Sequence, residues 1–383
     1  MKSKINIVFL AAISIIVLGG TVKPFVKPIK ENIYENRVAE KIPKFDYQTF
    51  LNKDFQNQFE LALADQIPFG NQMKVAKKSL DLLAILQYSK YTDTTYKNLP
   101  KGMKMIGENL LYAPIENSKD LKEKLKNKID NYIETISDIE DVEFFLYYIE
   151  KDTDINFETG EKLGAYEYIK SMLPTKITSS KFAIDNFDIF KEYFYKTDHH
   201  WNYNGSYNGY KEVIDLLNVK EPAIHIQDKK CLLAKFSGSK SRAIGAQYVL
   251  KDMFCIYEFD IPKQDLTCGT EKCIFGHGEK YVNNTLKEVT YGDYYGGDYG
   301  LLEIVTENEK KDNLLIIGES YDNAINLLVA SHFHKTYNID LRNYEYLMNK
   351  EFNIKQFIKD HNIDKVLFIG NIDFYILEKF NLK

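Results

Sequence analysis

Residues 313–370 alternate apolar runs with helical patterns, and this alternation constrains the fold more than any other feature of the chain. The runs NLLIIG, KTYNIDL and DKVLFIG read as strands, and ESYDNAINLLVASHF and EFNIKQFIKDHN read as the helices between them. Continuous apolar strands that alternate with helices are typical of a parallel sheet covered on both faces. Binding sites in such sheets lie at the carboxyl ends of the strands. The sequence therefore predicts an α/β fold with its site after these strands.

The remainder of the chain fits one large domain with a lead-in and an insertion. The 383 residues are 44% hydrophobic and 27% charged, which is a globular composition. We expect a stalk and helical lead-in over residues 23–95 and the main domain over residues 96–383. Ser118 reads as the N-cap of an amphipathic helix, and VEFFLYYIE after it reads as a buried strand. Residues 220–300 are turn-rich, tyrosine-rich and strand-like, and predict an insertion.

The N-terminus carries a membrane signal. Lys2 and Lys4 precede a nearly uninterrupted apolar run from Ile5 to Val22. At about 1.5 Å per residue this run can just span a hydrocarbon core of about 30 Å. Because no clear small-residue cleavage site follows, residues 1–22 are predicted as a signal anchor rather than a cleaved signal peptide. The leading lysines predict a single-pass protein at the cell surface, with its body outside the cytoplasm.

Charge and cysteine content narrow the partners. The formal net charge is −5 without a basic cluster, which argues against a nucleic-acid partner. The four cysteines fall close together, at Cys231, Cys255, Cys268 and Cys273. Outside the cell they would form two disulfides, in any of three connectivities, while free buried thiols are the alternative. A zinc site is disfavoured because the C-x-x-C spacing is missing.

Two strand ends carry candidate catalytic side chains. Ser320 follows the strand NLLIIG at a turn into a helix, where its hydroxyl would be exposed and helix N–H groups would stabilise an oxyanion. The alternative is that Ser320 is only the N-cap of that helix. Asn371 follows the strand DKVLFIG, where its amide would donate to the same oxyanion or would merely be a turn residue.

The segment KTDHHWNYNGS supplies the groups that a nucleophilic serine needs. Asp198 and His200 are two residues apart, so on extended backbone both side chains would point the same way and the carboxylate would orient the imidazole. His200 would then accept the proton of Ser320. His199 is expected to point away as a supporting residue. Together these residues predict an acyl-transfer site without a metal or cofactor.

At this point the sequence resembles a known family. KTDHHWNYNGSYNGY is similar to the signature of the DHHW proteins, close to the AlgJ/AlgX group of polysaccharide O-acetylation proteins, whose fold is SGNH-hydrolase-like. The resemblance extends through ENRVAEKIPKF, ELALADQIPF, MIGENLLYAP, YYGGDYG, LLIIGES and YNIDLRNY. It carries the family's acid and base to Asp198 and His200, and its nucleophile to Ser320. One departure is Glu319, which stands where the family usually has aspartate.

The resemblance implies a function and partners. It implies transfer of acetyl groups to hydroxyls of an extracellular polysaccharide through an acetyl-Ser320 intermediate, with a membrane-embedded acyltransferase as the acetyl donor. Tyr321, Trp201 and Arg342 are candidate substrate or oxyanion contacts. A packing role for the lone Trp201 and an ion pair of Arg342 with Asp340 are the alternatives.

Three other functions remain open from the sequence. A polysaccharide acetylesterase would use the same residues with water as the acceptor. A non-catalytic polysaccharide-binding or scaffold protein would agree with the departure at Glu319. A metal-dependent phosphoesterase of the DHH type would use the DHH segment and DTD at residues 152–154, but enzymes of that type are typically cytosolic and need more acidic clusters.

Overall fold

The computed structural model describes residues 28–29, 31–32, 37–66, 70–92, 99–250, 252–269 and 288–383. Within these ranges no helix combines the length and the apolar character that a bilayer crossing requires. The predicted signal anchor at residues 1–22 lies outside the described residues and stays a prediction.

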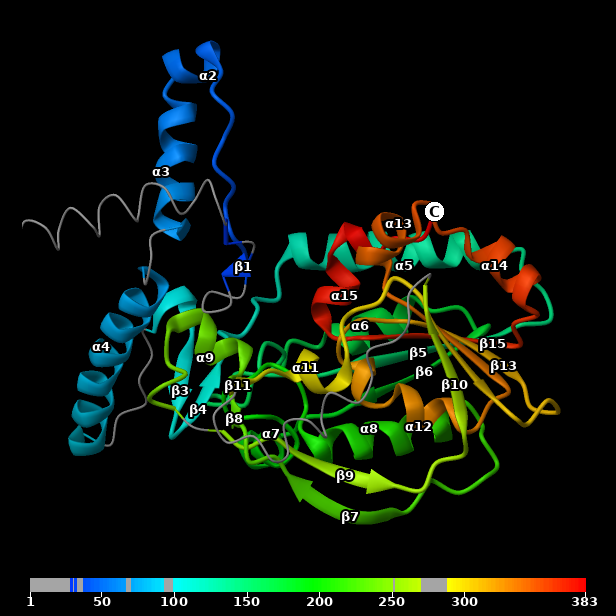
Figure 1. Cartoon of the computed structure of the whole chain (residues 1–383). Coiled ribbons are helices and arrows are strands. Elements are labelled where there is room, and N and C mark those ends of the chain that lie inside the picture. Colours follow the sequence, from blue (N-terminus) through cyan, green and yellow to red (C-terminus); the bar gives the residue numbers. More distant parts are fainter. Residues whose placement is uncertain are drawn as a thin grey trace, which may run out of the picture.

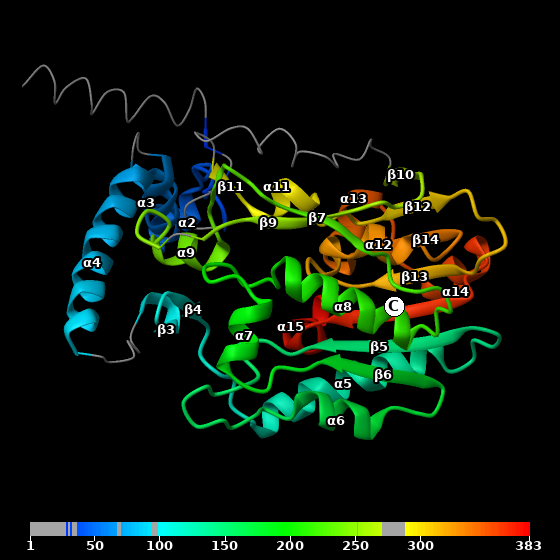
Figure 2. The ribbon, with the colours of Figure 1, turned by 90° about the horizontal axis from the view of Figure 1, so that it is seen from below.

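A seven-stranded sheet organises the main domain (Figure 1). Figure 2 shows the strands laid out in their spatial order. That order is β10 (Gln264–Cys268), β12 (Leu302–Thr306), β14 (Lys335–Ile339), β13 (Asn313–Ile317), β15 (Lys365–Gly370), β5 (Glu143–Ile149) and β6 (Ile177–Phe182).

The sheet is mixed rather than purely parallel. Strands β14, β13, β15, β5 and β6 pair in parallel, as the alternating pattern predicts. At one edge β12 pairs antiparallel with β14, and β10 pairs antiparallel with β12. The prediction of a parallel sheet is therefore right for its centre and wrong for this edge, whose strands come from or border the insertion.

Both faces of the sheet are buried, which explains the continuous apolar runs. Along β5, Phe144, Leu146 and Tyr148 pack into one core, whereas Phe145 and Tyr147 pack into the other. The same alternation holds along β13 and β15 because successive side chains point to opposite faces. Helices α5 (Lys119–Ile136), α13 (Leu341–Met348) and α14 (Ile354–His361) cover the face that is uppermost in Figure 1. Helices α8 (Tyr203–Leu216) and α12 (Asn326–Ala330) cover the other face.

Side-chain caps set the starts of the covering helices. The hydroxyl of Ser118 accepts a hydrogen bond from the N–H of Leu121, which confirms the predicted N-cap. Asn202 and Asn353 cap α8 and α14 in the same way. The other helices of the main domain outside the insertion are α6 (Ala165–Met172), α7 (Phe187–Tyr193) and α15 (Ile372–Ile376).

The helix predicted after NLLIIG is shorter than its pattern suggests. A 3₁₀ turn, η2 (Asp322–Ala324), comes first, and α12 follows it. The chain instead leaves β13 through a turn at Ser320 and Tyr321. This turn places Ser320 at the carboxyl edge of the sheet.

The predicted insertion forms small sheets beside the main one. Besides β10, which joins the edge of the main sheet, its elements are β7 (Ile226–Cys231), β8 (Lys235–Phe236), α9 (Ser239–Ile244), β9 (Cys255–Phe259), β11 (Glu288–Val289) and α11 (Tyr291–Tyr295). Strands β7 and β9 form an antiparallel ribbon closed by a disulfide between Cys231 and Cys255. Cys268 is not a free thiol, and Cys273 lies outside the described residues.

The lead-in consists of helices that stand beside the sheet, with an arm that projects from it (Figure 1). Its elements are β1 (Glu31–Asn32), β2 (Arg37–Val38), α2 (Tyr47–Leu51), α3 (Asp54–Gln66) and α4 (Gly70–Thr92). The main domain then begins with η1 (Pro100–Gly102) and the antiparallel strand pair β3 (Lys104–Ile106) and β4 (Asn109–Leu111). Ser79 on α4 donates to the carbonyl oxygen of Gly245 at 2.9 Å, so α4 is tied to the main domain. Near the C-terminus, η3 (Glu378–Phe380) is the last helical turn of the described chain.

Candidate active site

Ser320 lies where β13 reaches the carboxyl edge of the sheet. The preceding Gly318 has no room for a side chain, because an added Cβ would lie 1.9 Å from the Asp322 carboxylate. This close approach makes the turn after the strand tight. Tyr321, not Ser320, is the N-cap of η2 and makes no side-chain cap. The N-cap alternative for Ser320 is therefore not what the structure shows.

Asp198 and His200 meet on a bend, not on an extended strand. Phe194 and Trp201 form an antiparallel bridge that closes the loop between them. Inside the loop, the backbone N–H of His200 donates to Asp198 Oδ1 at 3.0 Å, an Asx-type turn. The Asp198 and His200 side chains lie close together as expected. The cause is this turn, not the alternation of side chains along an extended strand.

A continuous chain of hydrogen bonds joins the three predicted catalytic residues. Ser320 Oγ lies 2.8 Å from His200 Nε2, although 120 positions separate the two residues. His200 Nδ1 lies 2.6 Å from Asp198 Oδ1. Because the carboxylate can only accept, Nδ1 carries the proton and Nε2 is free to accept the proton of the serine. The arrangement can thus activate the Ser320 hydroxyl as a nucleophile.

The surroundings keep Asp198 ionised. Burial opposes ionisation of this side chain, which is 1% exposed, but the charge and hydrogen bond of His200 hold the pKa of the carboxyl well below its usual range. The N–H of Ser239 also donates to Asp198 Oδ2 at 2.6 Å. On its other side, the ring of Tyr291 stacks on the His200 imidazole at 3.7 Å between centroids and 5° between planes. These contacts fix the orientation of the base.

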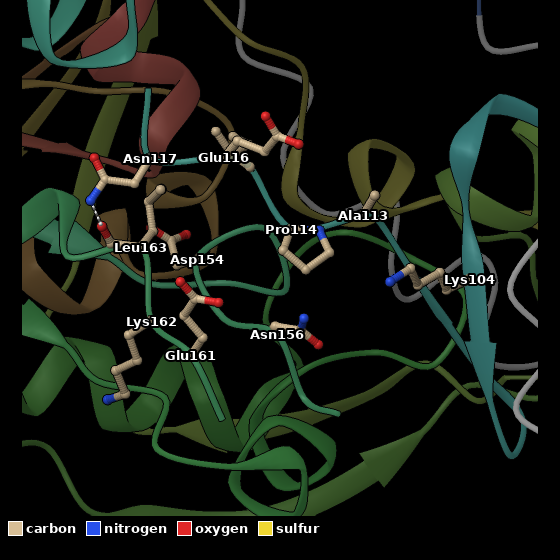
Figure 3. A pocket seen from close by; sticks show the side chains of 11 residues that line it. Lys104, Ala113, Pro114, Glu116, Asn117, Asp154, Asn156, Glu161, Lys162 and Leu163 are labelled. Carbon is tan, nitrogen blue, oxygen red and sulfur yellow. Dashed lines mark hydrogen bonds between the residues drawn. The ribbon is translucent and has the colours of Figure 1, made fainter. Parts of the chain in front are cut away.

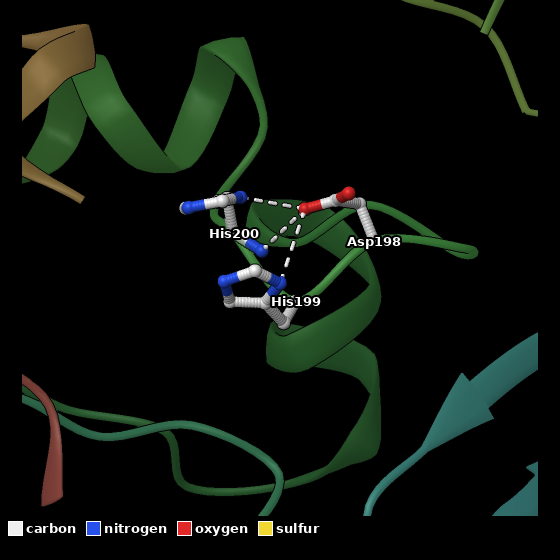
Figure 4. Close-up of side chains that lie close together, drawn as sticks. All are labelled: Asp198, His199 and His200. Atoms are coloured by element: carbon white, nitrogen blue, oxygen red, sulfur yellow. Dashed lines mark hydrogen bonds and ion pairs between the residues drawn. The ribbon is translucent and has the colours of Figure 1, made fainter. Parts of the chain in front are cut away.

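His199 lies beside His200 rather than pointing away from it (Figure 4). Their ring centroids are 3.8 Å apart, and His199 Nδ1 lies 2.6 Å from the hydroxyl of Ser239. Burial, followed by the nearby charge of His200, lowers the pKa of His199 well below its usual value. The expectation of an opposite direction is wrong because the bend brings both rings to one side. The supporting role of His199 stays a prediction, and the contact that would carry it is the one with Ser239, whose N–H binds Asp198.

Asp198, His199 and His200 also form the single potential metal-binding group that the described residues contain. Both ring nitrogens of His200 are already hydrogen-bonded, to Asp198 and Ser320, so a metal on this group would have to break the chain of hydrogen bonds. Asp152 instead pairs with Lys240 at 2.6 Å. The arrangement thus fits a serine nucleophile better than a metal centre.

The side chains of Trp201 and Tyr321 pack in the core, which corrects their prediction as sugar contacts. The predicted oxyanion role of Tyr321 stays a prediction. The indole of Trp201 is 0% exposed and donates to the carbonyl oxygen of Tyr321 at 3.0 Å. The Tyr321 ring is equally buried, and its hydroxyl donates to the carbonyl oxygen of His199. A sugar cannot reach either ring. The two residues instead bind the loop of the base to the turn of the nucleophile.

Arg342 and Asn371 lie near the edge of the sheet but are engaged by protein carboxylates. Arg342 forms an ion pair with Asp340, which is the alternative to substrate binding that the sequence offered. It also pairs with Asp298 at 2.8 Å. The side-chain amide and the backbone N–H of Asn371 both donate to Glu319 Oε1. Burial raises the pKa of Glu319, while the charge of Lys151 partly offsets this. In this structure the Asn371 amide is therefore held by Glu319.

The sequence did not indicate Ser239 or Tyr291. Both belong to the insertion, about which the periodicity of the sequence says nothing. One weak signal is Gly238, where an added Cβ would lie 2.3 Å from the carbonyl oxygen of Thr197. A glycine permits a close backbone approach, but it does not indicate which segment approaches.

A cavity of about 440 Å³ lies against the segment after β4 and the loop after β5 (Figure 3). Glu116, Asp154 and Glu161 line it together with Asn156 and Lys104. Burial raises the pKa of the Asp154 carboxyl to about 7. Since β5 ends at the same edge of the sheet as β13, this polar cavity and Ser320 lie on one side of the domain.

Comparison with known structures defines the class of fold. The chain has the fold of the DHHW family protein from Eubacterium siraeum, with a TM-score of 0.51 and 19% identity over 73% of this chain and 92% of that one. It is also similar to PatB1 from Bacillus cereus, with a TM-score of 0.57 and 21% identity over 73% of this chain and 99% of that one. The resemblance to DHHW proteins is confirmed at the level of the fold. No family model and no curated protein matches the chain by sequence.

Proposed function

We propose that the protein is an extracytoplasmic O-acetyltransferase that modifies a polysaccharide through an acetyl-Ser320 intermediate. The observation that carries this proposal is the chain of hydrogen bonds from Ser320 through His200 to Asp198. A serine is a weak nucleophile alone and is activated by an adjacent, oriented base. The polysaccharide O-acetylation proteins that the sequence resembles give the acyl group and the acceptor class.

The reaction has two balanced halves. First, Ser320 Oγ attacks the acetyl carbonyl, His200 Nε2 takes the hydroxyl proton, and the donor leaves with that proton as the acetyl–serine ester forms. Then a sugar hydroxyl gives its proton to His200 and attacks the ester, and Ser320 regains a proton as it leaves. Asp198 remains ionised and stabilises the imidazolium in both halves.

The membrane and the donor belong to the same proposal. Acetyl-CoA does not reach the outside of the cell, so an exported enzyme needs an acetyl group delivered across the membrane. We assign this step to a membrane-embedded acyltransferase and assign residues 1–22 to an anchor that keeps the domain at the cell surface. The polar cavity of Figure 3 offers carboxylate and amide oxygens that can accept bonds from sugar hydroxyls.

Two alternatives use the same fold. An acetylesterase would release the acetyl group from Ser320 to water, and a scaffold protein would bind polysaccharide without forming the ester. Glu319 is the residue that favours the scaffold, because its carboxylate occupies the amide of Asn371, a predicted oxyanion donor.

Intact mass after incubation with p-nitrophenyl acetate tests the proposal. PatB1 has also been solved with a sulfonyl adduct, so a sulfonyl fluoride is a suitable second probe. We expect one acetyl or sulfonyl group on the wild type, none on Ser320→Ala, and much slower labelling of His200→Ala. Added chelator should leave labelling unchanged. Loss of the acetyl group only when an oligosaccharide is added identifies a transferase, and loss to water alone identifies an esterase.

A wild-type protein that takes up neither group, while remaining folded by circular dichroism, would contradict the serine mechanism. Labelling that survives in Ser320→Ala would show that another nucleophile reacts. Labelling that is abolished by chelator would support the metal alternative at Asp198, His199 and His200.

A further inference from the structure

The arm formed by α2 and α3 exposes a group of apolar side chains at its end. Phe45, Tyr47, Phe50 and Leu51 are 66%, 66%, 42% and 64% exposed, and we call these four residues the aromatic tip. Helix α2 has no buried residue at all. In Figure 1 this end of the arm is the part of the described chain that projects farthest from the sheet. Large apolar side chains gathered at one exposed place mark an interaction surface.

The arm is built to hold this tip in place. The ring of Phe45 contacts those of Phe50 and Phe55, with centroids 5.6 Å and 5.3 Å apart. Asp46 caps α2 by accepting from the backbone N–H groups of Gln48 and Thr49. The tip is therefore an ordered surface and not a set of unrelated exposed rings.

Hydrogen bonds also close the base of the arm. Gln66 at the end of α3 exchanges hydrogen bonds with the backbone of Ile29, at 2.7 Å and 3.0 Å. Asp65 accepts from the N–H of Glu40 at 3.0 Å. Both Asp65 and Gln66 are buried. The segment that leads out to the tip is thus fastened where the arm begins, and α3 of 13 residues, or about 20 Å, separates the base from the tip.

We propose that the aromatic tip inserts into the surface of the membrane that anchors the chain. This inference rests on the anchor assigned under the proposed function. The apolar run Ile5–Val22 ends shortly before the tip, so the tip would be tethered close to the bilayer at high effective concentration. Aromatic rings and a leucine next to Lys44 and Lys53 match the boundary between headgroups and acyl chains, because the lysine stems can extend their charges to the headgroups.

The inference gives the arm a mechanical role. Two attachments, the anchor and the tip, would fix the orientation of the domain on the membrane, whereas a single tether would leave it free to rotate. Binding of the aromatic tip to the membrane depends on apolar and aromatic contact, since Asp46 and Asp54 balance the neighbouring lysines in charge. It should therefore occur on zwitterionic lipid.

Tryptophan fluorescence in proteoliposomes tests this proposal on the full chain. Trp201 is the single tryptophan and is fully buried, so Phe50→Trp adds a reporter against a known background. Tyr346→Trp is the matched control, because Tyr346 is 86% exposed on α13 in the main domain. Each variant is reconstituted in phosphatidylcholine with or without bromine on the acyl chains.

We expect brominated lipid to quench the added emission of Phe50→Trp by about twofold or more and to leave that of Tyr346→Trp unchanged. Equal quenching of the two variants overturns the proposal. Shielding of Phe50→Trp from both brominated lipid and soluble acrylamide also overturns it and indicates a protein partner, such as a second copy. Flotation of the wild type after an alkaline wash reports on the anchor separately. Flotation without quenching refutes the insertion of the tip and leaves the anchor standing. Absence of flotation refutes both the anchor and the insertion of the tip.

Discussion

Replacing Asp198 by asparagine tests whether this carboxylate sets the tautomer of His200. Asp198 Oδ1 accepts from His200 Nδ1 at 2.6 Å and from the backbone N–H of His200 at 3.0 Å, and Oδ2 accepts from the N–H of Ser239 at 2.6 Å. Asparagine keeps one acceptor oxygen and places an NH₂ donor at the other position. Whichever way the amide turns, its NH₂ group faces one backbone N–H, so one buried donor loses its partner.

The two orientations of the amide are unequal. With NH₂ toward Ser239, two donors meet at the shorter contact of 2.6 Å. With NH₂ toward His200, the donors meet at 3.0 Å, and the amide gains a hydrogen bond to Nδ1. We expect the second orientation. It places the imidazole proton on Nε2, the nitrogen that must accept the proton of Ser320, so the base is lost although the geometry survives.

The expected cost is most of the general-base contribution, or a loss of about 10³-fold in kcat/KM, equivalent to about 4 kcal/mol. The assay is the rate of Ser320 acetylation by p-nitrophenyl acetate, followed by intact mass. Asp252→Asn is the matched control, because Asp252 binds the same loop through the backbone N–H of Thr197 at 3.0 Å without touching His200. Asp198→Asn that keeps more than about a tenth of the wild-type rate would falsify the tautomer argument.

Two further predictions concern stability. Gly205→Ala should lower the free energy of unfolding by about 1 to 3 kcal/mol in urea titration, because its Cβ would lie 2.2 Å from the carbonyl oxygen of Tyr193. A gain in stability, the usual result for this change in a helix, would contradict that contact. For Asp154, burial raises the folded-state pKa to about 7, so between about pH 4 and 7 the folded protein keeps a proton that the unfolded chain has released. Stability from this group therefore falls as pH rises, and Asp154→Asn should gain on the order of 2 kcal/mol relative to the wild type between pH 5 and 8. A pH-independent difference between the two proteins would show that Asp154 does not titrate there.

The centre of the fold could be predicted because its signals are local. The apolar runs of β13 and β15 place side chains in both cores, so each run by itself indicates a strand buried on two faces. The position of Ser320 then followed from the rule that sites lie at strand ends. The antiparallel pairing of β10 and β12 with the main sheet was not predicted, because these strands come from or border the tyrosine-rich insertion, whose pattern does not show where its strands pair.

The supporting groups of the site could not be predicted, since they depend on contacts between distant segments. Ser239 reaches Asp198 across 41 positions, and nothing in its own neighbourhood indicates that partner. The same holds for Tyr291 on His200. For Trp201 the sequence suggested a contact that does not exist. Its residue type indicated a sugar contact, but the structure shows that the indole is buried against the Tyr321 backbone.

The separation of the nucleophile from its base along the chain has a consequence for maturation. Ser320 and His200 are 120 positions apart, and β13 pairs on both sides with strands that follow Ser320 in the sequence, β14 and β15. The hydroxyl therefore becomes reactive only after the chain has been completed to about Gly370 and the sheet has closed around β13. If the protein is exported and acetylated as proposed, the unfolded chain carries a serine that the acetyl donor cannot yet modify.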